Sequence, residues 1–205
     1  MKLLFAPTSA FVRKVMVCAE LTGQTADIEL LDSAAHPVKR DARIAAHNPL
    51  AKVPTLLLDD GQALYDSHVI CEYLAHRAGD TTLFPTAGPT RWLTLTRHAL
   101  GDGMLDAALL ARYELTTRPP DKQWPIWREA LLEKIWAGLA SIERMADDLK
   151  VEQPSIGEIA LGCALGYLDF RYPELDWRMR SPRAARWNEA FQALPAMQAT
   201  RPYDL

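Results

Sequence analysis

The sequence of 205 residues lacks the features that mark several large protein classes. It has only three cysteines, Cys18, Cys71 and Cys163, which lie far apart and form no CxxC pair. This spacing excludes a disulfide framework and a cysteine-based metal site, and it indicates buried free thiols in a reducing compartment. Acidic residues outnumber basic ones, 26 against 23, so a nucleic-acid partner is not expected.

Long hydrophobic runs are also missing. Nothing approaches the ~18 consecutive apolar residues of a membrane-spanning helix. The apolar stretch at residues 2–6 ends at Pro7 and is too short for the core of a signal peptide. The composition, 49% hydrophobic and 24% charged, is typical of a folded globular protein. We therefore expect a cytoplasmic protein with no membrane partner.

The first 78 residues alternate between short apolar runs and helical patterns. Their order predicts strand, helix, strand, helix, strand, strand, helix, which indicates a mixed sheet covered by helices. Asp59, Asp60 and Gly61 are typical of a hairpin turn between the last two strands. The predicted elements cover residues 2–6, 10–21, 28–31, 42–47, 53–58, 63–65 and 68–77.

After Gly79 the pattern becomes entirely helical. Residues 79–89 have the composition of a linker. The chain is therefore predicted to hold two domains, residues 1–78 and 90–205. Its six tryptophans are expected to pack inside the second, because tryptophan is usually largely buried. The predicted helices of this domain cover residues 91–117, 124–149, 155–171 and 184–194.

Ser9 is the first candidate for chemistry. It lies between a strand and an amphipathic helix, where serine commonly caps the helix. The same hydroxyl, with the free N–H groups of the first turn, could hold an anion such as a thiolate and lower the pKa of its thiol. Ser9 has no His or Asp base nearby in the sequence, so it is not expected to be an acyl-transfer nucleophile.

Two further motifs follow in the same domain. Pro54 stands at the entry to a strand, where a cis bond would turn Val53 so that its N–H and C=O could pair with a peptide-like ligand; base rates favour a trans bond. Asp66 and Ser67 open a helix and could be simple caps. They could also bind the ammonium and carboxylate of an amino-acid end.

In this order and on this framework, the three motifs resemble the glutathione S-transferase family in its soluble two-domain, serine-type form. Ser155 and Glu158 form a capping box that resembles the start of the family's central helix. The resemblance covers essentially the whole chain. It implies a thioredoxin-like α/β N-terminal domain with a mixed four-stranded sheet, and an all-α C-terminal domain that supplies the electrophile pocket and dimer contacts.

The resemblance also implies roles for individual residues. Pro54 would be the family's cis-proline and Ser9 the catalytic hydroxyl beside the glutathione sulfur, with Thr8 as the alternative contact. A hydrophobic pocket between the domains would receive the electrophile. The implied glutathione ligands are Thr8, Lys39, Lys52, Val53, Pro54, Asp66, Ser67 and, across a homodimer interface, Asp102. The implied pocket residues are Phe11, Met104, Ala108, Arg112 and Tyr113.

His98, Asp102 and Asp106 are spaced four residues apart and share one face of a predicted helix. Because two carboxylates at this spacing repel, the face is expected to meet water, a cation or a partner subunit. The first reading is a solvated stripe. The second is that Asp102 reaches the γ-glutamyl ammonium of glutathione bound to the other subunit.

The activity implied is conjugation of glutathione, as co-substrate and without a metal, to a small hydrophobic electrophile in detoxification. Alternatives are a glutathione-dependent isomerase or peroxidase, or a non-catalytic glutathione-binding or scaffold protein. Ala10 stands where relatives often have proline. Position 9 is not cysteine, so the family members that exchange disulfides are a poorer match. The physiological electrophile stays open.

Overall fold

The computed structural model describes residues 1–204, which form two compact units. The first unit combines residues 1–91 with 195–204, and the second is Trp92–Leu194. The grouping differs from the predicted domain ranges, because the end of the chain packs with the first unit. One contact that holds it there is a buried hydrogen bond of 3.0 Å from the Arg13 guanidinium to the carbonyl oxygen of Met197.

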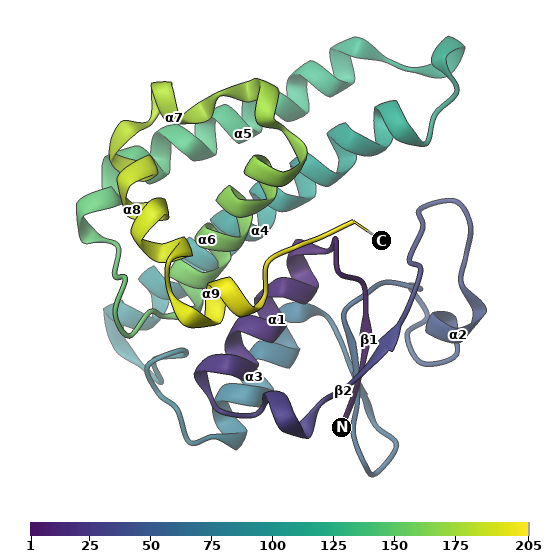
Figure 1. The fold of residues 1–205 in the computed structure, drawn as a ribbon, viewed down its shortest axis with the longest axis vertical. Helices are drawn as coiled ribbons and strands as arrows, with labels where there is room; N and C mark the ends of the chain where they lie inside the picture. The colour runs from purple at the N-terminus through teal and green to yellow at the C-terminus, as the bar shows by residue number, and fades with distance from the viewer. Residues whose placement is uncertain (205) are drawn as a thin grey trace. The chain divides into compact units, whose positions relative to one another are not determined.

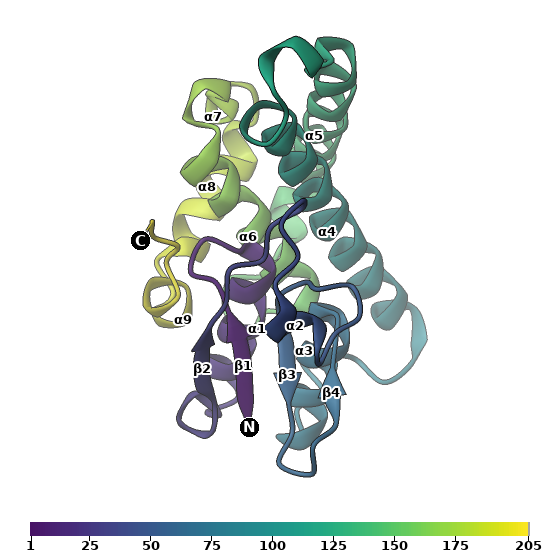
Figure 2. The same cartoon turned by 90° about the vertical axis from the view of Figure 1, so that its right-hand side faces the viewer.

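A mixed four-stranded sheet is the centre of the first unit, as predicted, with the strand order β2-β1-β3-β4 (Figure 2). Strand β1 runs parallel to β2 and antiparallel to β3, and β3 runs antiparallel to β4. A hairpin at Asp59–Gly61 joins β3 to β4, and Gly61 adopts the positive φ of 90° that such a turn requires. The strands are β1 (Lys2–Phe5), β2 (Glu29–Asp32), β3 (Thr55–Leu57) and β4 (Ala63–Leu64).

Helices cover both faces of this sheet. Helices α1 and α3 pack together on one face, α2 lies on the other, and α9 packs against α1 (Figure 1). Helix α1 begins after Ser9 and ends before Gly23, whose φ of 68° terminates it. Its apolar residues at helical spacing make it part of a continuous core. The helices are α1 (Ala10–Leu21), α2 (Ala42–Ala45), α3 (Ser67–Arg77), α9 (Pro195–Ala199) and the 3₁₀ turn Thr25–Asp27.

The second unit is helical throughout, and α4, which enters it from residue 88, meets α5 at the tip seen at the upper right of Figure 1. Two glycines allow close packing: a Cβ on Gly101 would lie 2.6 Å from the backbone of Ala160, and one on Gly138 would lie 2.5 Å from the Met104 sulfur. The helices are α4 (Gly88–Thr116), α5 (Pro125–Met145), α6 (Ile156–Arg171), α7 (Trp177–Arg180), α8 (Pro182–Gln192) and the 3₁₀ turns Pro120–Lys122, Ala146–Asp148 and Pro173–Leu175.

The prediction that all tryptophans pack inside is wrong for three of them. Trp177 and Trp187 are buried, but Trp92 is 67% exposed, Trp124 60% and Trp127 39%. The exposed three lie near the starts of α4 and α5, Trp92 within α4, Trp127 within α5 and Trp124 directly before it. The prediction of buried thiols is confirmed, since all three cysteines are free and buried. No helix within residues 1–204 has the length and apolar character to cross a membrane.

Candidate functional site

The strand register gathers the three sequence motifs at one end of the sheet. Leu4 of β1 lies opposite Thr55 of β3, and Leu56 of β3 lies opposite Leu64 of β4. Three segments therefore meet at the same end of the sheet, the upper end in Figure 2. They are the segment that follows β1, the segment that precedes β3 and the segment that follows β4. These segments carry Thr8 and Ser9, Val53 and Pro54, and Asp66 and Ser67.

Ser9 is the N-cap of α1. Its Oγ accepts the N–H of Val12 at 3.3 Å, and within residues 1–204 the hydroxyl has no acceptor for its own proton. The N–H groups of Ala10 and Phe11 likewise bond no described residue. Because capping uses the hydroxyl only as an acceptor, one O–H and two N–H donors remain at the positive end of the helix. The partly exposed Thr8 hydroxyl also bonds no described group.

The loop before β3 presents Val53, and the Val53–Pro54 bond is cis, as the resemblance implies. The N–H and C=O of Val53 bond no other group in the described chain. Buried Asn48, which the sequence reasoning missed, holds this loop. Its Nδ2 donates to the Lys52 carbonyl at 3.2 Å and to Thr55 Oγ1 at 3.0 Å. Side-chain hydrogen bonds of this kind follow no periodic pattern in a sequence. A polar residue next to Pro49 was the one feature that could have indicated the role of Asn48.

Asp66 and Ser67 begin α3. Asp66 is the N-cap, and its carboxylate accepts the His68 N–H at 3.0 Å. Ser67 is 2% exposed, yet neither its hydroxyl nor its N–H bonds any residue among 1–204. The Ser67 hydroxyl is not one of the fully buried side-chain atoms that lack a partner in the described chain, so it keeps contact with solvent and can meet a ligand. The start of α3 can therefore accept an anionic group, with the exposed Asp66 carboxylate beside it.

The two lysines of the predicted glutathione set lie in exposed loops. Lys39 lies between β2 and α2, where its backbone N–H donates to His36 Nδ1 at 3.0 Å. Lys52 directly precedes Val53. Between the two lysines, Asp41 caps α2, and hydrogen bonds from Arg43 hold the pKa of the Asp41 carboxyl below its ordinary value.

The remaining predicted residues, apart from Phe11, belong to the second unit. The buried His98 lies 3.2 Å from the Asp102 carboxylate, so the helix face that carries both is not simply a solvated stripe. Met104 and Ala108 are buried, and the Ala108 carbonyl accepts the Tyr172 hydroxyl at 2.5 Å. Arg112 and Tyr113 are partly exposed. Burial raises the pKa of the Tyr113 hydroxyl above its ordinary value of 10.0.

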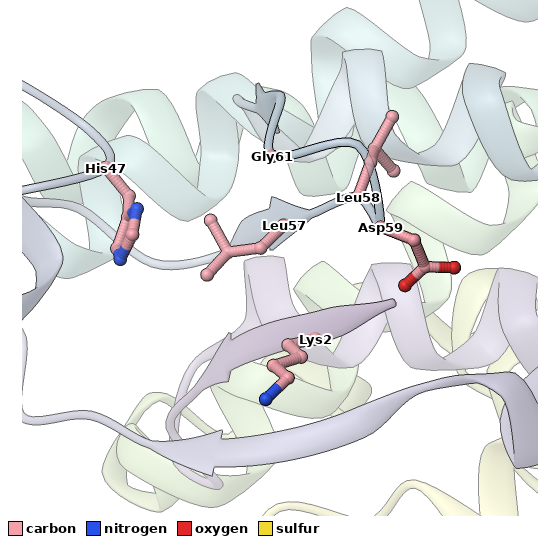
Figure 3. A pocket seen from close by; sticks show the side chains of 6 residues that line it. All are labelled: Lys2, His47, Leu57, Leu58, Asp59 and Gly61. Carbon is pink, nitrogen blue, oxygen red and sulfur yellow. The ribbon is translucent and has the colours of Figure 1, made fainter.

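A pocket in the first unit, shown in Figure 3, lies at the opposite end of the sheet, beside Leu57 and the β3–β4 hairpin. Its charged groups already have partners. Lys2 Nζ is 3.3 Å from Glu29, and Asp59 is 3.1 Å from the N-terminal ammonium. Its lining includes none of Ser9, Val53 and Ser67. No group of three or more His, Cys, Asp or Glu side chains within residues 1–204 is arranged to hold a metal ion.

Comparison with known proteins assigns this architecture to a family. Residues 8–77 match the model of the glutathione S-transferase N-terminal domain, and residues 125–190 match that of the C-terminal domain. An uncharacterized GST-like protein of Escherichia coli, YibF, is 31% identical, with 98% of each chain covered.

Solved structures agree. A glutathione transferase family member from Pseudomonas fluorescens, crystallised with glutathione, has a TM-score of 0.96 and 44% identity over 99% of both chains. A glutathione S-transferase from Methylobacillus flagellatus with glutathione bound has a TM-score of 0.86 and 36% identity, over 98% of this chain and 99% of that one. With both domain models matched in order and relatives of this identity along the whole chain, the protein belongs to the glutathione S-transferase family.

Proposed function

We propose that this protein is a glutathione transferase that holds the glutathione thiolate at the start of α1 and conjugates it to a small hydrophobic electrophile. The observation that carries the proposal is the hydrogen bonding of the Ser9 hydroxyl. Its hydroxyl accepts the Val12 N–H and keeps its proton for a further bond. A thiolate can receive that proton as a hydrogen bond, together with the N–H groups of the first turn, and each such bond lowers the thiol pKa.

The rest of glutathione would lie along the end of the sheet that carries the three motifs. The open N–H and C=O of Val53 suit the cysteinyl unit, which would pair with them like an added strand. The unsatisfied donors of Ser67 suit the γ-glutamyl carboxylate, and Asp66 suits its ammonium. Lys52, and Lys39 from its own loop, would pair with the glycine carboxylate at the other end of the tripeptide.

A homodimer would complete the glutathione site. Asp102 of the partner subunit would meet the γ-glutamyl ammonium, and its contact with His98 at 3.2 Å would orient the carboxylate. Among the residues that the resemblance implies for the electrophile, Arg112 and Tyr113 on α4 are accessible to it, whereas Met104 and Ala108 are buried. A Pseudomonas fluorescens relative, 42% identical and with a TM-score of 0.91 over the whole of both chains, was crystallised with S-(propanoic acid)-glutathione. A bound S-substituted glutathione of this kind supports a second half-site beside the sulfur.

The reaction needs little from the protein beyond binding and charge stabilisation. Glutathione loses its thiol proton to solvent on binding, and the thiolate attacks the electrophilic carbon. With a chloronitroaromatic, a C–S bond forms and chloride leaves with the electron pair of the C–Cl bond. Holding both reactants together removes the entropic cost of their encounter. The physiological role would be detoxification in the cytoplasm, and the buried free thiols favour such a reducing compartment.

The alternatives have less support. A peroxidase that used a cysteine of its own would need an accessible thiol, and Cys18, Cys71 and Cys163 are all buried. A glutathione-dependent peroxidase would instead use the same bound thiolate as conjugation, so only activity with hydroperoxides separates the two. A scaffold would have no use for unsatisfied donors at Ser9 and Ser67. An isomerase would use the same thiolate, and its substrate would differ only in the second half-site.

Steady-state conjugation of chlorodinitrobenzene tests the proposal. We expect wild-type turnover above the spontaneous rate, and a loss of about a hundredfold in kcat for Ser9→Ala, typical of removing one donor to a developing or resident anion. Thr8→Ala is the matched control and should retain most of the activity. The reverse pattern would assign the sulfur contact to Thr8. Absence of turnover with several electrophile classes, despite glutathione binding in calorimetry, would reject conjugation and leave the isomerase and the non-catalytic alternatives.

A further inference from the structure

The C-terminal parts of α4 and α6 bring together polar side chains that have no partner in the described chain. Gly101 of α4 packs against the backbone of Ala160 of α6. Further along both helices, the Ala108 carbonyl accepts the Tyr172 hydroxyl at 2.5 Å, so the two helices run side by side in the same direction. The unpaired side chains beyond this bond form the Arg112 cluster, which lies within the second unit and consists of Arg112, Tyr113 and Tyr167.

Tyr167 of α6 gives the clearest sign of a ligand. The residue is 6% exposed, yet its hydroxyl bonds no residue among 1–204. The hydroxyl oxygen is not one of the fully buried atoms that lack a partner, so it keeps contact with solvent. Because a largely buried phenol normally has a hydrogen-bond partner, a group that enters from solvent is the expected one.

Arg112 of α4 supplies an unpaired positive charge beside this hydroxyl. Its guanidinium is partly exposed and makes no hydrogen bond or ion pair within residues 1–204. Burial raises the pKa of the Tyr113 and Tyr167 hydroxyls, and the charge of Arg112 opposes that rise at both. Since such an effect weakens with distance, the guanidinium and the two hydroxyls lie near one another.

The charges around the Arg112 cluster favour an anion. Arg171 also acts on the Tyr167 hydroxyl, and Arg128 of α5 acts on Tyr172. Glu174 opposes them, but it lies 4.0 Å from Arg128, whose own Nε is buried without a partner. Three guanidinium groups therefore surround the tyrosines, and one carboxylate only partly offsets them. A positive site of this kind attracts a negatively charged ligand.

We propose that the Arg112 cluster binds a carboxylate carried by the electrophile, so that the enzyme prefers acidic electrophiles to neutral ones. This inference rests on the proposed function and narrows its substrate class to molecules with a reactive carbon at one end and a carboxylate at the other. The guanidinium can donate two parallel bonds to the carboxylate oxygens, and the hydroxyls of Tyr113 and Tyr167 can donate to their remaining lone pairs. A neutral amide offers one weaker acceptor.

Pairs of electrophiles that differ only in charge test this preference. The short pair is iodoacetate and iodoacetamide, and the long pair is chloronitrobenzoate and chloronitrobenzamide. With iodoacetate, the glutathione thiolate forms a C–S bond to the methylene carbon, and iodide leaves with the electron pair of the C–I bond. Each kcat/KM is divided by the spontaneous rate constant of the same electrophile with free glutathione. We expect the wild type to prefer the acid by about tenfold in at least one pair.

Variants of the cluster should remove this preference. Arg112→Gln should lower the acid-to-amide ratio of kcat/KM by about tenfold, because the carboxylate loses its charge-assisted bonds. Tyr167→Phe keeps the ring and should lower the ratio by about threefold, as expected for one hydrogen bond. Arg144→Gln, which removes an exposed arginine of α5, is the matched control and should keep the wild-type ratio.

Calorimetry with the two products of the short pair separates this inference from the proposed function, because it requires no turnover. Tighter binding of S-carboxymethylglutathione than of S-carbamoylmethylglutathione, lost in Arg112→Gln, would support the carboxylate site even if conjugation failed. Turnover of both members of each pair without a preference for the acid would reject the carboxylate site and leave conjugation intact. An equal loss of the ratio in Arg112→Gln and Arg144→Gln would also reject it, since the effect would then follow from net charge alone.

Discussion

The Nδ2 atom of Asn48 lies 3.0 Å from Oγ1 of Thr55, and that hydroxyl in turn donates to the Lys52 carbonyl at 2.9 Å. Asn48 also accepts the N–H of Leu50 at 3.0 Å through its side-chain oxygen. A single buried amide thus fixes both ends of the loop that carries Val53. In the proposed binding mode Asn48 would act indirectly, by positioning the backbone of Val53 that meets glutathione.

Replacing Asn48 should therefore affect stability and glutathione affinity together. Asn48→Ala leaves buried partners unpaired, and we expect the free energy of unfolding to fall by about 1–3 kcal/mol. The KM for glutathione should rise by about tenfold with little change in kcat, because Ser9 is untouched. Thr55→Ser, which keeps the hydroxyl, is the control for Thr55→Val, which removes it. An unchanged KM in a destabilised Asn48→Ala variant would show that the loop does not position glutathione.

Ser67 offers a cleaner separation of binding from stability. Its hydroxyl bonds no residue of the described chain, so Ser67→Ala should change the free energy of unfolding by less than about 0.5 kcal/mol. Glutathione affinity should fall by about tenfold, because the γ-glutamyl carboxylate loses a charge-assisted hydrogen bond. Calorimetry with cysteinylglycine, which lacks the γ-glutamyl group, is the control and should give equal affinities for both proteins. An equal loss for both ligands would disconnect Ser67 from that carboxylate.

The first unit was predictable where local signals agree. Ser9 and Gly23 frame an apolar repeat at helical spacing, and α1 spans Ala10–Leu21 as predicted. Strand β2 was predicted one residue early, over 28–31. Its pairing with β1, which sets Lys2 opposite Glu29, decides its start, and a single sequence does not contain that register.

Features set by contacts distant in sequence could not be predicted. The end of the chain packs on α1 through Arg13 and Met197, 184 residues apart, and nothing in either segment indicates this. The exposure of Trp124 depends on its place at a helix end, whereas residue statistics favour burial. Likewise, the donors left open at Ser67 follow from the capping of α3 by Asp66. The sequence indicated the residue, and the structure adds its hydrogen-bonding state.

The capping box of α6 should be the most sensitive polar cluster in the second unit. Glu158 is buried, accepts the Arg97 guanidinium at 2.7 Å, and accepts both the N–H and the hydroxyl of Ser155 at 2.9 and 2.5 Å. Because Glu158→Ala leaves the largely buried Arg97 charge unpaired, urea unfolding should show a loss of about 3 kcal/mol, the lower end of the cost of breaking a buried ion pair. Ser155→Ala should lose about 1 kcal/mol. The exposed Glu133→Ala is the control, and a Glu158→Ala variant as stable as that control would contradict this assignment.

Tyr172 gives the second unit a dependence on alkaline pH. Burial, with a smaller effect of Tyr167, raises the pKa of its hydroxyl from 10.0 to about 12. The folded protein therefore holds the proton more tightly than the unfolded chain, so the stabilising contribution is complete below pH 10 and is lost as the pH approaches 12.

Tyr172→Phe also lacks the hydrogen bond to the Ala108 carbonyl and should be about 1 kcal/mol less stable at neutral pH. In urea unfolding at a series of pH values, the wild type should lose stability more steeply than Tyr172→Phe between pH 10 and 12, so that the two curves converge. Tyr203→Phe, a change at an exposed tyrosine, should follow the wild type throughout. Parallel wild-type and Tyr172→Phe curves would mean that this hydroxyl does not couple folding to pH.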